Sequence, residues 1–595
     1  MASYRGTLPL THETGADRLL RSLLQHGVDT LFGLCGDHVN PIFVAAPRHG
    51  VRIVDVRHEA AAVHMADGYA RVGRRAGVSV VTGGPGHTNS VTGIATAAAA
   101  GSPVVAISGS YEPEQRGRLA FQEMDQAGIV QPLAKSARLL EDAAQIDSAV
   151  EAAFKEALSG RPGPVHLSIP LGVLSRAPGS GREGASAAPA GGGTRTPATS
   201  GPGAMPVLPA NGAEAPRPDP AAVRELVGRL RTAARPVMIA GSGAFWSEAG
   251  AELARFAELT RTPCFTIDLA RGLMSDTHPL CFGYADPVLN PAARAFAEAD
   301  FVLIIGKRVD FRLGFGGPRV FRPDAALAQV DIRAGEFGRN RPVQMSILAD
   351  ARQALAAFAE EAAPRAGGEQ AGGWPERPWL EELRSRGRAW RESWREGENS
   401  DESPLHPLRV CAEVRALLPE DAVIVIDGGD WPQWPRMTLP ARRPGGWVRL
   451  GALGTVGAGL PLALGARMAR PSGPVVLFIG DGGMGFHLAE LHTAVRHRLN
   501  VVIVVGNDEG WGMEREIQSA LYGPGAVHGC ELGPVRYDEL AGSFGLHAAR
   551  VDRAAELRPA LERALAAGRP ALVDVRLRKG SVSPLTAASI AAKRV

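Results

Sequence analysis

Two aspartates follow apolar runs in the last third of the sequence, and each lies in a turn that contains glycine. The run 474–479 ends at Gly480-Asp481-Gly482, and the run 501–505 ends at Gly506-Asn507-Asp508. Both runs have strand composition and 486–498 has helical periodicity, which predicts strand, helix, strand. A right-handed crossover brings both strand ends to one edge of a parallel sheet. Two carboxylates beside glycine N–H groups suit Mg²⁺ and a diphosphate; the alternative is a turn aspartate and a helix cap.

Glu59 is the second candidate for chemistry. The run 51–56 reads as a strand and 60–71 as the helix that follows it, which places Glu59 at the start of that helix. A glutamate in the first turn is favoured by the helix dipole alone. Combined with the C-terminal aspartates, it is instead a candidate catalytic carboxylate.

The composition is that of an ordinary globular protein. The 595 residues are 45% hydrophobic and 21% charged, with a net charge of +3, enough for about three or four domains. No basic block indicates nucleic acid, and neither a long apolar run nor a signal peptide indicates a membrane. The five cysteines are scattered without metal-ligand spacing, which favours free thiols and a cytoplasmic location.

Two composition shifts divide the chain. The segment 179–219 is rich in Gly, Ala, Pro, Ser and Thr, and predicts a flexible linker. A second break begins at 363 and continues through a polar helical stretch to 404. Apolar runs alternate with helical patterns in each part between these breaks, which predicts an α/β protein with three modules of parallel sheet flanked by helices. The predicted domains are 1–178, 220–362 and 405–578, followed by a tail at 579–595.

These motifs resemble those of thiamine diphosphate enzymes of the acetolactate synthase and benzaldehyde lyase superfamily, and most closely the 2-hydroxyacyl-CoA lyases. The resemblance covers nearly the whole chain and implies pyrimidine-binding, central and diphosphate-binding domains in that order. It implies that Mg²⁺ is held by Asp481, Asp508 and the backbone carbonyl of Gly510. Asp508 departs from the family, which has asparagine at this position, so it adds a negative charge.

The resemblance also assigns cofactor contacts. Glu59 would bind the aminopyrimidine ring and activate the thiazolium carbon. Val456 would support the bent cofactor where relatives often have a larger residue. Further implied contacts with thiamine diphosphate are Pro85, Asn89, Gly429, Asp430, Gly454, Asp481, Gly482, Gly483, Asn507, Asp508, Gly510, Trp511 and Gly512.

Residues near the reacting carbon are implied in the same way. His38, Gln122 and Glu514 are the candidates for proton transfer or orientation beside Glu59. A carboxylate at Glu514 would repel a second ketoacid, which favours a lyase over an acetolactate synthase. The implied substrate contacts are Cys35, Asp37, Arg312, Met513 and Ile517. Arg312 suits either the carboxylate of a ketoacid or a phosphate of coenzyme A.

Together these residues favour cleavage of a 2-hydroxyacyl-CoA to formyl-CoA and an aldehyde or ketone, reversible as a carboligation. The alternatives are a carboligase acting on pyruvate or free aldehydes, similar to acetolactate synthase or benzaldehyde lyase, and a non-catalytic cofactor-binding subunit. The central domain of relatives holds FAD, ADP, part of coenzyme A or nothing, and Gly241-Ser242-Gly243 is a weak nucleotide signal. The family further implies a homodimer or homotetramer with sites between subunits, and a C-terminal tail that closes as a lid.

Overall fold

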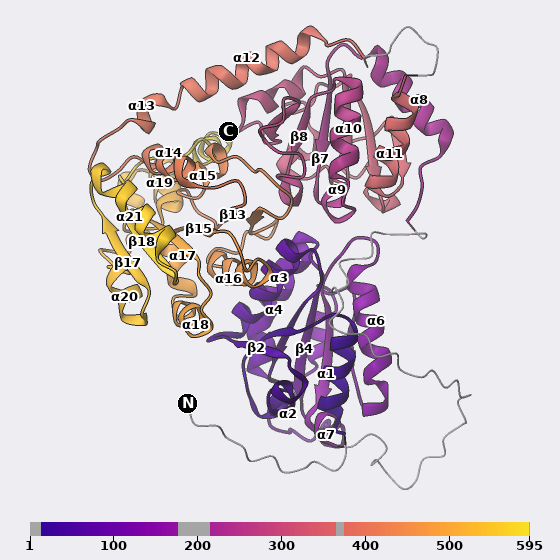
Figure 1. Cartoon of the computed structure of the whole chain (residues 1–595), viewed down its shortest axis with the longest axis vertical. Coiled ribbons are helices and arrows are strands. Elements are labelled where there is room, and N and C mark those ends of the chain that lie inside the picture. Colours follow the sequence, from indigo (N-terminus) through magenta and orange to yellow (C-terminus); the bar gives the residue numbers. More distant parts are fainter. Residues whose placement is uncertain (1–12, 177–214, 365–373, 594–595) are drawn as a thin grey trace.

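A computed structural model describes residues 13–176, 215–364 and 374–593. It contains three six-stranded sheets, and every strand pairs with its neighbours in parallel. Helices lie against the sheets (Figure 1). The α/β fold class with three parallel-sheet modules is therefore confirmed. Most of the predicted linker 179–219 lies outside the described residues.

The first sheet has the strand order β2-β1-β3-β4-β6-β5. Its strand β2 and helix α3 correspond to the strand and helix predicted on either side of Glu59. The strands are β1 Thr30–Gly33, β2 Arg52–Asp55, β3 Gly77–Val81, β4 Val104–Ser110, β5 Ala137–Leu139 and β6 Val165–Pro170. The helices are α1 Gly15–Gln25, α2 Asn40–Ala45, α3 Glu59–Gly73, α4 Pro85–Ala100, α5 Gln126–Val130, α6 Ile146–Leu158 and α7 Leu171–Ser175.

The central sheet has the order β12-β11-β10-β7-β8-β9. Its strands are β7 Pro236–Ala240, β8 Cys264–Thr266, β9 Cys281–Tyr284, β10 Phe301–Ile305, β11 Ala326–Asp331 and β12 Met345–Leu348. Its helices are α8 Pro220–Thr232, α9 Ser242–Trp246, α10 Gly250–Thr260 and α11 Ala351–Ala362. Strands β7 and β10 are buried throughout, as expected when both faces of a parallel sheet are covered.

The third sheet has the order β14-β13-β15-β16-β18-β17. Its strands are β13 Val423–Ile426, β14 Trp447–Arg449, β15 Val475–Gly480, β16 Val502–Asn507, β17 His547–Val551 and β18 Ala571–Arg576. Its helices are α14 Pro407–Leu417, α15 Gln433–Thr438, α16 Gly459–Ala469, α17 Asp481–Phe486, α18 Glu490–His497, α19 Gly512–Tyr522, α20 Tyr537–Phe544, α21 Ala554–Ala566 and α22 Pro584–Lys593. The helix expected at 486–498 is α18, and a further short helix, α17, starts directly at Asp481 before it.

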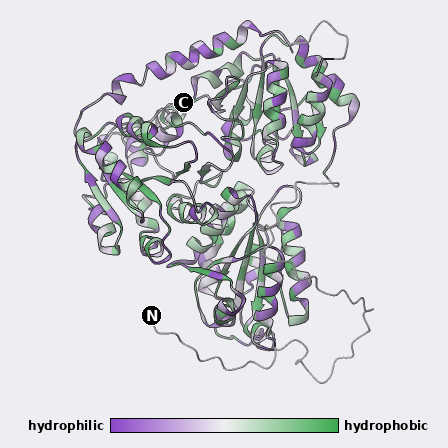
Figure 2. Cartoon of the chain, viewed as in Figure 1, coloured by the Kyte–Doolittle hydropathy of each residue, from purple (hydrophilic) through white to green (hydrophobic). Residues whose placement is uncertain are grey.

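The described part of the segment between the central and third sheets is helical, as its polar helical pattern predicted. It contains α12 Pro378–Glu392 and α13 Arg395–Glu398, and α12 spans the top of the molecule in Figure 1. Figure 2 shows that α12 is largely hydrophilic. Three apolar residues on one side, Trp379, Leu380 and Leu383, are nevertheless buried, so this helix packs onto the central unit with a narrow apolar stripe.

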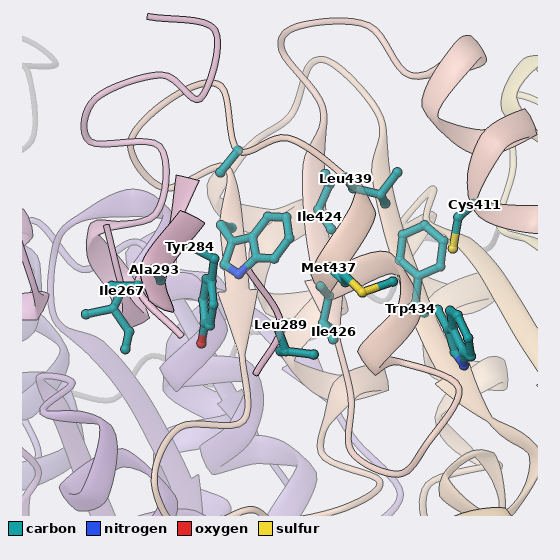
Figure 3. Packing of buried hydrophobic residues seen from close by; sticks show 14 of the residues in the cluster. Ile267, Tyr284, Leu289, Ala293, Cys411, Ile424, Ile426, Trp434, Met437 and Leu439 are labelled. Atoms are coloured by element: carbon teal, nitrogen blue, oxygen red, sulfur yellow. The ribbon is translucent and has the colours of Figure 1, made fainter. Parts of the chain in front are cut away.

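Two hydrophobic cores join the third sheet to the other units. One core combines residues of the central and third sheets, and Figure 3 shows Leu289 of the central unit beside Ile426 of the third. The other core joins the first and third units through α3 and α16. The third unit therefore shares buried apolar surface with both of the others.

Glycine permits the close crossing of α3 and α16. A Cβ at Gly68 of α3 would lie 2.2 Å from the carbonyl oxygen of Leu462, and one at Gly465 of α16 would lie 2.0 Å from that of Met65. Both contacts are with backbone, which cannot move aside as a flexible side chain can. In the described part of the chain, no helix has the length and apolar character needed to cross a membrane.

Candidate active site

A pocket lies at the carboxyl ends of β13, β15 and β16, at the edge where the two aspartates were expected to meet. We call it the β15–β16 pocket. Asp481 follows β15 directly and Asp508 follows β16, and both line it. The described residues around it lie between 407 and 581, and those predicted for cofactor or substrate are Gly429, Asp430, Val456, Asp481, Gly482, Gly483, Asp508, Gly510, Trp511, Gly512, Met513 and Glu514.

The two aspartates create a concentrated negative charge. The N–H of Gly510 donates to Oδ2 of Asp481 (2.8 Å), and Tyr537 donates its hydroxyl to the Asp481 carbonyl (2.7 Å). Burial, and after it the charge of Asp508, raises the pKa of Asp481 to about 7. Burial also raises the pKa of Asp508. Buried carboxylates that resist ionisation together are stabilised by a cation.

This donor set fits Mg²⁺ with a diphosphate better than an all-protein metal site. Among the described residues, no group of three or more His, Cys, Asp and Glu side chains is arranged to hold a metal. Mg²⁺ commonly takes one or two carboxylates together with phosphate oxygens. Asp481 and Asp508 are therefore sufficient protein carboxylates when a diphosphate supplies the remaining oxygens.

The backbone around the aspartates leaves room for such a ligand. A Cβ at Gly482 would lie 2.6 Å from the Trp511 ring, so that turn requires glycine. Gly429, which lines the pocket, has a φ angle of 90°, and a Cβ there would meet nothing within 4 Å. Gly454 also has a positive φ angle (72°), but it is not among the described residues that line the pocket. Open glycine turns that expose N–H groups suit phosphate oxygens, so the residues fit the diphosphate group.

A buried aspartate positions the loop that carries Val456. Asp427 follows β13 and accepts hydrogen bonds from the N–H groups of Gly457 (3.0 Å) and Gly459 (3.0 Å). Burial raises the pKa of Asp427 to about 7. The Val456 side chain packs against Gly428, where an added Cβ would lie 2.8 Å from Cγ2 of Val456. The place of Val456 in the pocket thus depends on Asp427.

The candidate residues of the first unit gather at the start of α3 and α4. Asn89 donates its amide to Oε2 of Glu59 (3.0 Å). Glu59 is the first residue of α3, and Pro85 is the first residue of α4. The structure therefore brings Glu59 and Asn89 into contact, although they are far apart in sequence.

His38 and Gln122 lie beside the glycine turn that precedes α4. Nδ1 of the buried His38 lies 3.2 Å from the Thr82 hydroxyl, and burial lowers its pKa. A Cβ at Gly84 would lie 2.7 Å from the Gln122 side chain. Cys35 and Asp37 are neighbours of His38 in sequence, and Cys35 is exposed.

Several predicted residues lie elsewhere. The Asn507 amide donates to Asp574 (3.0 Å) and to the Val535 carbonyl (3.1 Å), so its side chain holds the end of β16. Ile517 is buried in α19. Arg312 pairs with Asp268 (3.1 Å) and lines a different cavity.

That second cavity, which we call the central cavity, has walls from all three units. Arg71, Arg161, Lys307 and Arg449 bring cationic groups to it. Burial, and then the charges of Arg436 and Arg312, lower the pKa of Arg449 to about 9. Acidic side chains line the cavity as well, and Lys307 pairs with Asp268 (3.1 Å) and Asp310 (2.6 Å). The cavity is therefore mixed in charge, and its arginines are the side chains that suit a phosphate group.

Some supporting residues carried no signal in the sequence. Gln126 donates to Ser168 (2.8 Å) and the Gly109 carbonyl (2.9 Å) and accepts from the Gly84 N–H (3.0 Å), which fixes the turn before α4. The Asp430 carboxylate accepts hydrogen bonds from Ser583 (2.7 Å) and Thr586 of the C-terminal tail. Contacts between such distant residues have no spacing pattern from which to predict them.

The comparisons with known proteins agree with this geometry. Residues 13–129 match the N-terminal thiamine pyrophosphate binding domain of thiamine pyrophosphate enzymes, 223–358 their central domain, and 427–575 their C-terminal thiamine pyrophosphate binding domain. The chain belongs to the thiamine pyrophosphate enzyme family.

Individual relatives cover nearly the full chain. An acetolactate synthase large subunit of Mycobacterium tuberculosis is 36% identical over 563 residues, covering 94% of this chain and 95% of the relative. The human 2-hydroxyacyl-CoA lyase 2 is 32% identical over 557 residues, covering 89% of this chain and 84% of the relative. An acetolactate synthase large subunit of Parasynechococcus marenigrum is 32% identical over 577 residues, covering 95% of this chain and 88% of the relative. The expected superfamily is confirmed, and thiamine diphosphate is the cofactor that these domains imply.

Proposed function

We propose that the protein is a thiamine diphosphate- and Mg²⁺-dependent carboligase that joins two carbonyl compounds, as an acetolactate synthase does. The similarity of the whole chain to acetolactate synthase large subunits carries this choice over the lyase favoured from local motifs. Thiamine diphosphate, when bound, supplies a carbon nucleophile that attacks a carbonyl and stores the electron pair. The residues of this chain bind that cofactor, orient it and move protons.

Contacts among residues of this chain support each role. Asp481 and Asp508 would hold the cation, and the glycine turns that line the pocket would hold the diphosphate. Val456 would support the cofactor, because Asp427 fixes its loop. The carboxylate of Glu59, oriented by Asn89, would exchange a proton with the aminopyrimidine ring.

We propose that the complete site forms between two copies of the chain. Glu59 begins α3 of the first unit, whereas the described residues of the β15–β16 pocket all come from 407–581. Large apolar side chains next to both halves are exposed, namely Phe121 (78%), Leu453 (50%) and Phe486 (61%). Exposed apolar groups of this size beside an incomplete site favour an interface between copies. We propose a homodimer, or a homotetramer built from such dimers.

A 2-hydroxyacyl-CoA lyase is the second candidate, and two observations favour it. Glu514 lines the β15–β16 pocket, where its carboxylate would repel a ketoacid but can accept a proton from a hydroxyl. The central cavity brings Arg161 and Lys307 together, and such cations suit the phosphates of coenzyme A. ADP or FAD would suit the same cavity. In the lyase, His38 and Glu514 would act on the 2-hydroxyl group.

One assay separates the two reactions. The protein, supplied with thiamine diphosphate and Mg²⁺, is offered pyruvate in one reaction and 2-hydroxyisobutyryl-CoA, lactyl-CoA or mandelyl-CoA in others, with products identified by mass spectrometry. Acetolactate from pyruvate supports the carboligase. Formyl-CoA with a ketone or aldehyde, and no acetolactate, would replace it with the lyase. Cofactor binding without either product would indicate a non-catalytic subunit.

A further inference from the structure

Arg515 and Asp508 form an ion pair inside the β15–β16 pocket. Arg515 lies on the first turn of α19 and directs Nη2 back to Oδ2 of Asp508, while its Nη1 lies 3.4 Å from the Asp508 carbonyl. Their side chains are only 9% and 21% exposed. An ion pair held this far from water is screened much less than one on the surface.

The backbone between the two residues is shaped around this pair. A Cβ at Gly510 would lie 2.6 Å from Nη1 of Arg515, and a Cβ at Gly512 would lie 2.5 Å from Oδ2 of Asp508. Side chains at these two positions would therefore push the charged groups apart. The loop accommodates both the arginine and the aspartate, so the pair is a built part of the pocket.

The other charged groups near the pair do not balance the negative charge of Asp508. Asp481 and Asp430 both add negative charge near Asp508. Arg515 also approaches Glu516 (3.4 Å) and Glu531 (3.7 Å), which keep the guanidinium at the pocket wall. Asp430 is already held by hydroxyl groups of the tail. Arg515 is the cation that contacts Asp508 directly among the described ion pairs.

The net charge of residues 481, 508 and 515 depends on the ion pair. Asparagine at position 508 with a neutral residue at 515 would leave Asp481 as one negative charge. Aspartate at 508 with arginine at 515 leaves the same net charge. The aspartate alone would face the diphosphate with an additional negative charge, and Coulomb repulsion in a partly buried site is strong.

We infer that Arg515 is a positioning residue that neutralises Asp508 and holds its Oδ2, so that Oδ1 can face the cation without repelling the diphosphate. This inference rests on the proposed binding of thiamine diphosphate and Mg²⁺ in this pocket. It assigns to α19 a part in cofactor affinity that is separate from the substrate role predicted for Glu514.

The test is a double-mutant cycle on cofactor binding, with Arg515→Gln, Asp508→Asn and the double variant. Binding of thiamine diphosphate and of Mg²⁺ is followed by calorimetry and by quenching of tryptophan fluorescence, since Trp511 lines the pocket. Arg515→Gln should weaken thiamine diphosphate binding at saturating Mg²⁺ by about tenfold or more. Asp508→Asn should instead weaken Mg²⁺ binding by about tenfold, because Arg515 is left without its partner.

The double variant should bind both ligands within about threefold of the wild type, because the net charge is restored. Arg388→Gln, which breaks an exposed ion pair with Glu381, is the control and should bind as the wild type does. Thermal unfolding without ligands establishes that each variant is folded. For a variant that does not fold, Arg515→Lys replaces Arg515→Gln and should retain at least part of the wild-type affinity.

The outcomes distinguish the cofactor site itself from the role of Arg515 in it. If the wild type binds neither ligand, the proposed cofactor site is wrong. If the wild type binds both but the two single changes add without recovery in the double variant, the cofactor site stands and the role of Arg515 is overturned. Unchanged thiamine diphosphate binding in Arg515→Gln would overturn it equally.

Discussion

The Glu59 carboxylate has one hydrogen-bond partner from another helix, and its chemistry depends on that geometry. Asn89 donates to Oε2 and leaves the other oxygen to contact a ligand. An amide has almost the same shape as a carboxylate but cannot accept a proton at neutral pH. A change from glutamate to glutamine at position 59 therefore removes proton transfer while it keeps the shape of the side chain.

Glu59→Gln should lower turnover by at least about 100-fold, because a positioned acid or base commonly contributes that much. Thiamine diphosphate binding should change by less than tenfold in calorimetry. Glu114→Gln, in the same unit, is a control with the same chemical change and should retain turnover. Full turnover in Glu59→Gln would remove Glu59 from the catalytic group.

Single residues differed in how well they could be predicted. Asp481 and Asp508 were placed correctly at one sheet edge because apolar runs mark the strands that they follow. Asn507 stays a predicted cofactor contact, and its side-chain amide donates to Asp574 (3.0 Å); a motif fixes which residue ends a strand and not which way its side chain turns. The pairing of Arg515 with Asp508 depends on the start of α19, which the sequence does not mark.

At the scale of elements, the loop 454–457 illustrates how one buried group positions a segment. Its backbone is held by Asp427 across a distance of about 30 residues in sequence. Strand β13 was predictable as an apolar run, but the partner of the aspartate that follows it was not. Long-range hydrogen bonds of this kind arise only after the sheet has formed.

The pH dependence of stability tests the Asp427 contact. Burial raises the pKa of this carboxyl group from 3.8 to about 7, so between these values the folded protein binds more protons than the unfolded chain. The free energy of unfolding contributed by Asp427 is greatest below about pH 4 and is lost as the pH rises to about 7. In Asp427→Asn the dependence should be flatter over this range. Thermal unfolding of both proteins without cofactor, from pH 5 to pH 8, measures the difference; parallel curves would contradict the assignment.

The C-terminal helix α22 is fastened to the pocket through Asp430. Ser583 donates its hydroxyl (2.7 Å) and its N–H (3.1 Å) to this carboxylate, and α22 packs against α19. A hydrogen bond to a charged group contributes about 1.5–3 kcal/mol. Polar contacts with Asp430, which lines the β15–β16 pocket, therefore hold the start of α22 in place.

Ser583→Ala should accelerate hydrogen exchange of the amides in α22 by about tenfold or more, because one of these charged hydrogen bonds is lost. Exchange in β15 and β16 should stay unchanged. Ser581→Ala, which removes only a longer contact with Arg578 (3.3 Å), should have little effect on α22. Equal exchange in the two variants would show that the hydroxyl of Ser583 does not hold the tail.

At the scale of the whole molecule, the three sheets were predictable and their arrangement was not. Each module repeats apolar runs and helices, which is a local pattern. The contact of α3 with α16 depends on Gly68 and Gly465, in different modules. Helix α12 also lay in a segment predicted as a linker because its apolar stripe is only a few residues wide. Local patterns define the modules, whereas sparse contacts fix how they pack.

This arrangement makes the proposed sharing of sites testable with two inactive proteins. Glu59→Gln disables the first-sheet half of a site, and Asp481→Asn disables the third-sheet half. If one site takes its halves from two chains, a mixed dimer contains one site with both halves intact and one with both halves changed. If each chain forms its own site, every site in a mixed dimer carries one defect.

Refolding an equal mixture of the two variants should therefore restore about one quarter of wild-type activity, since about half of the dimers are mixed and each has one intact site. Each variant refolded alone should stay inactive, and size-exclusion chromatography with light scattering should show the same oligomer in all samples. The double variant Glu59→Gln/Asp481→Asn mixed with wild type is the matched control, because shared sites would then lose activity in the mixed dimers while separate sites would not. No recovery in the first mixture, with dimers present and mixed, would show that Glu59 serves the pocket of its own chain.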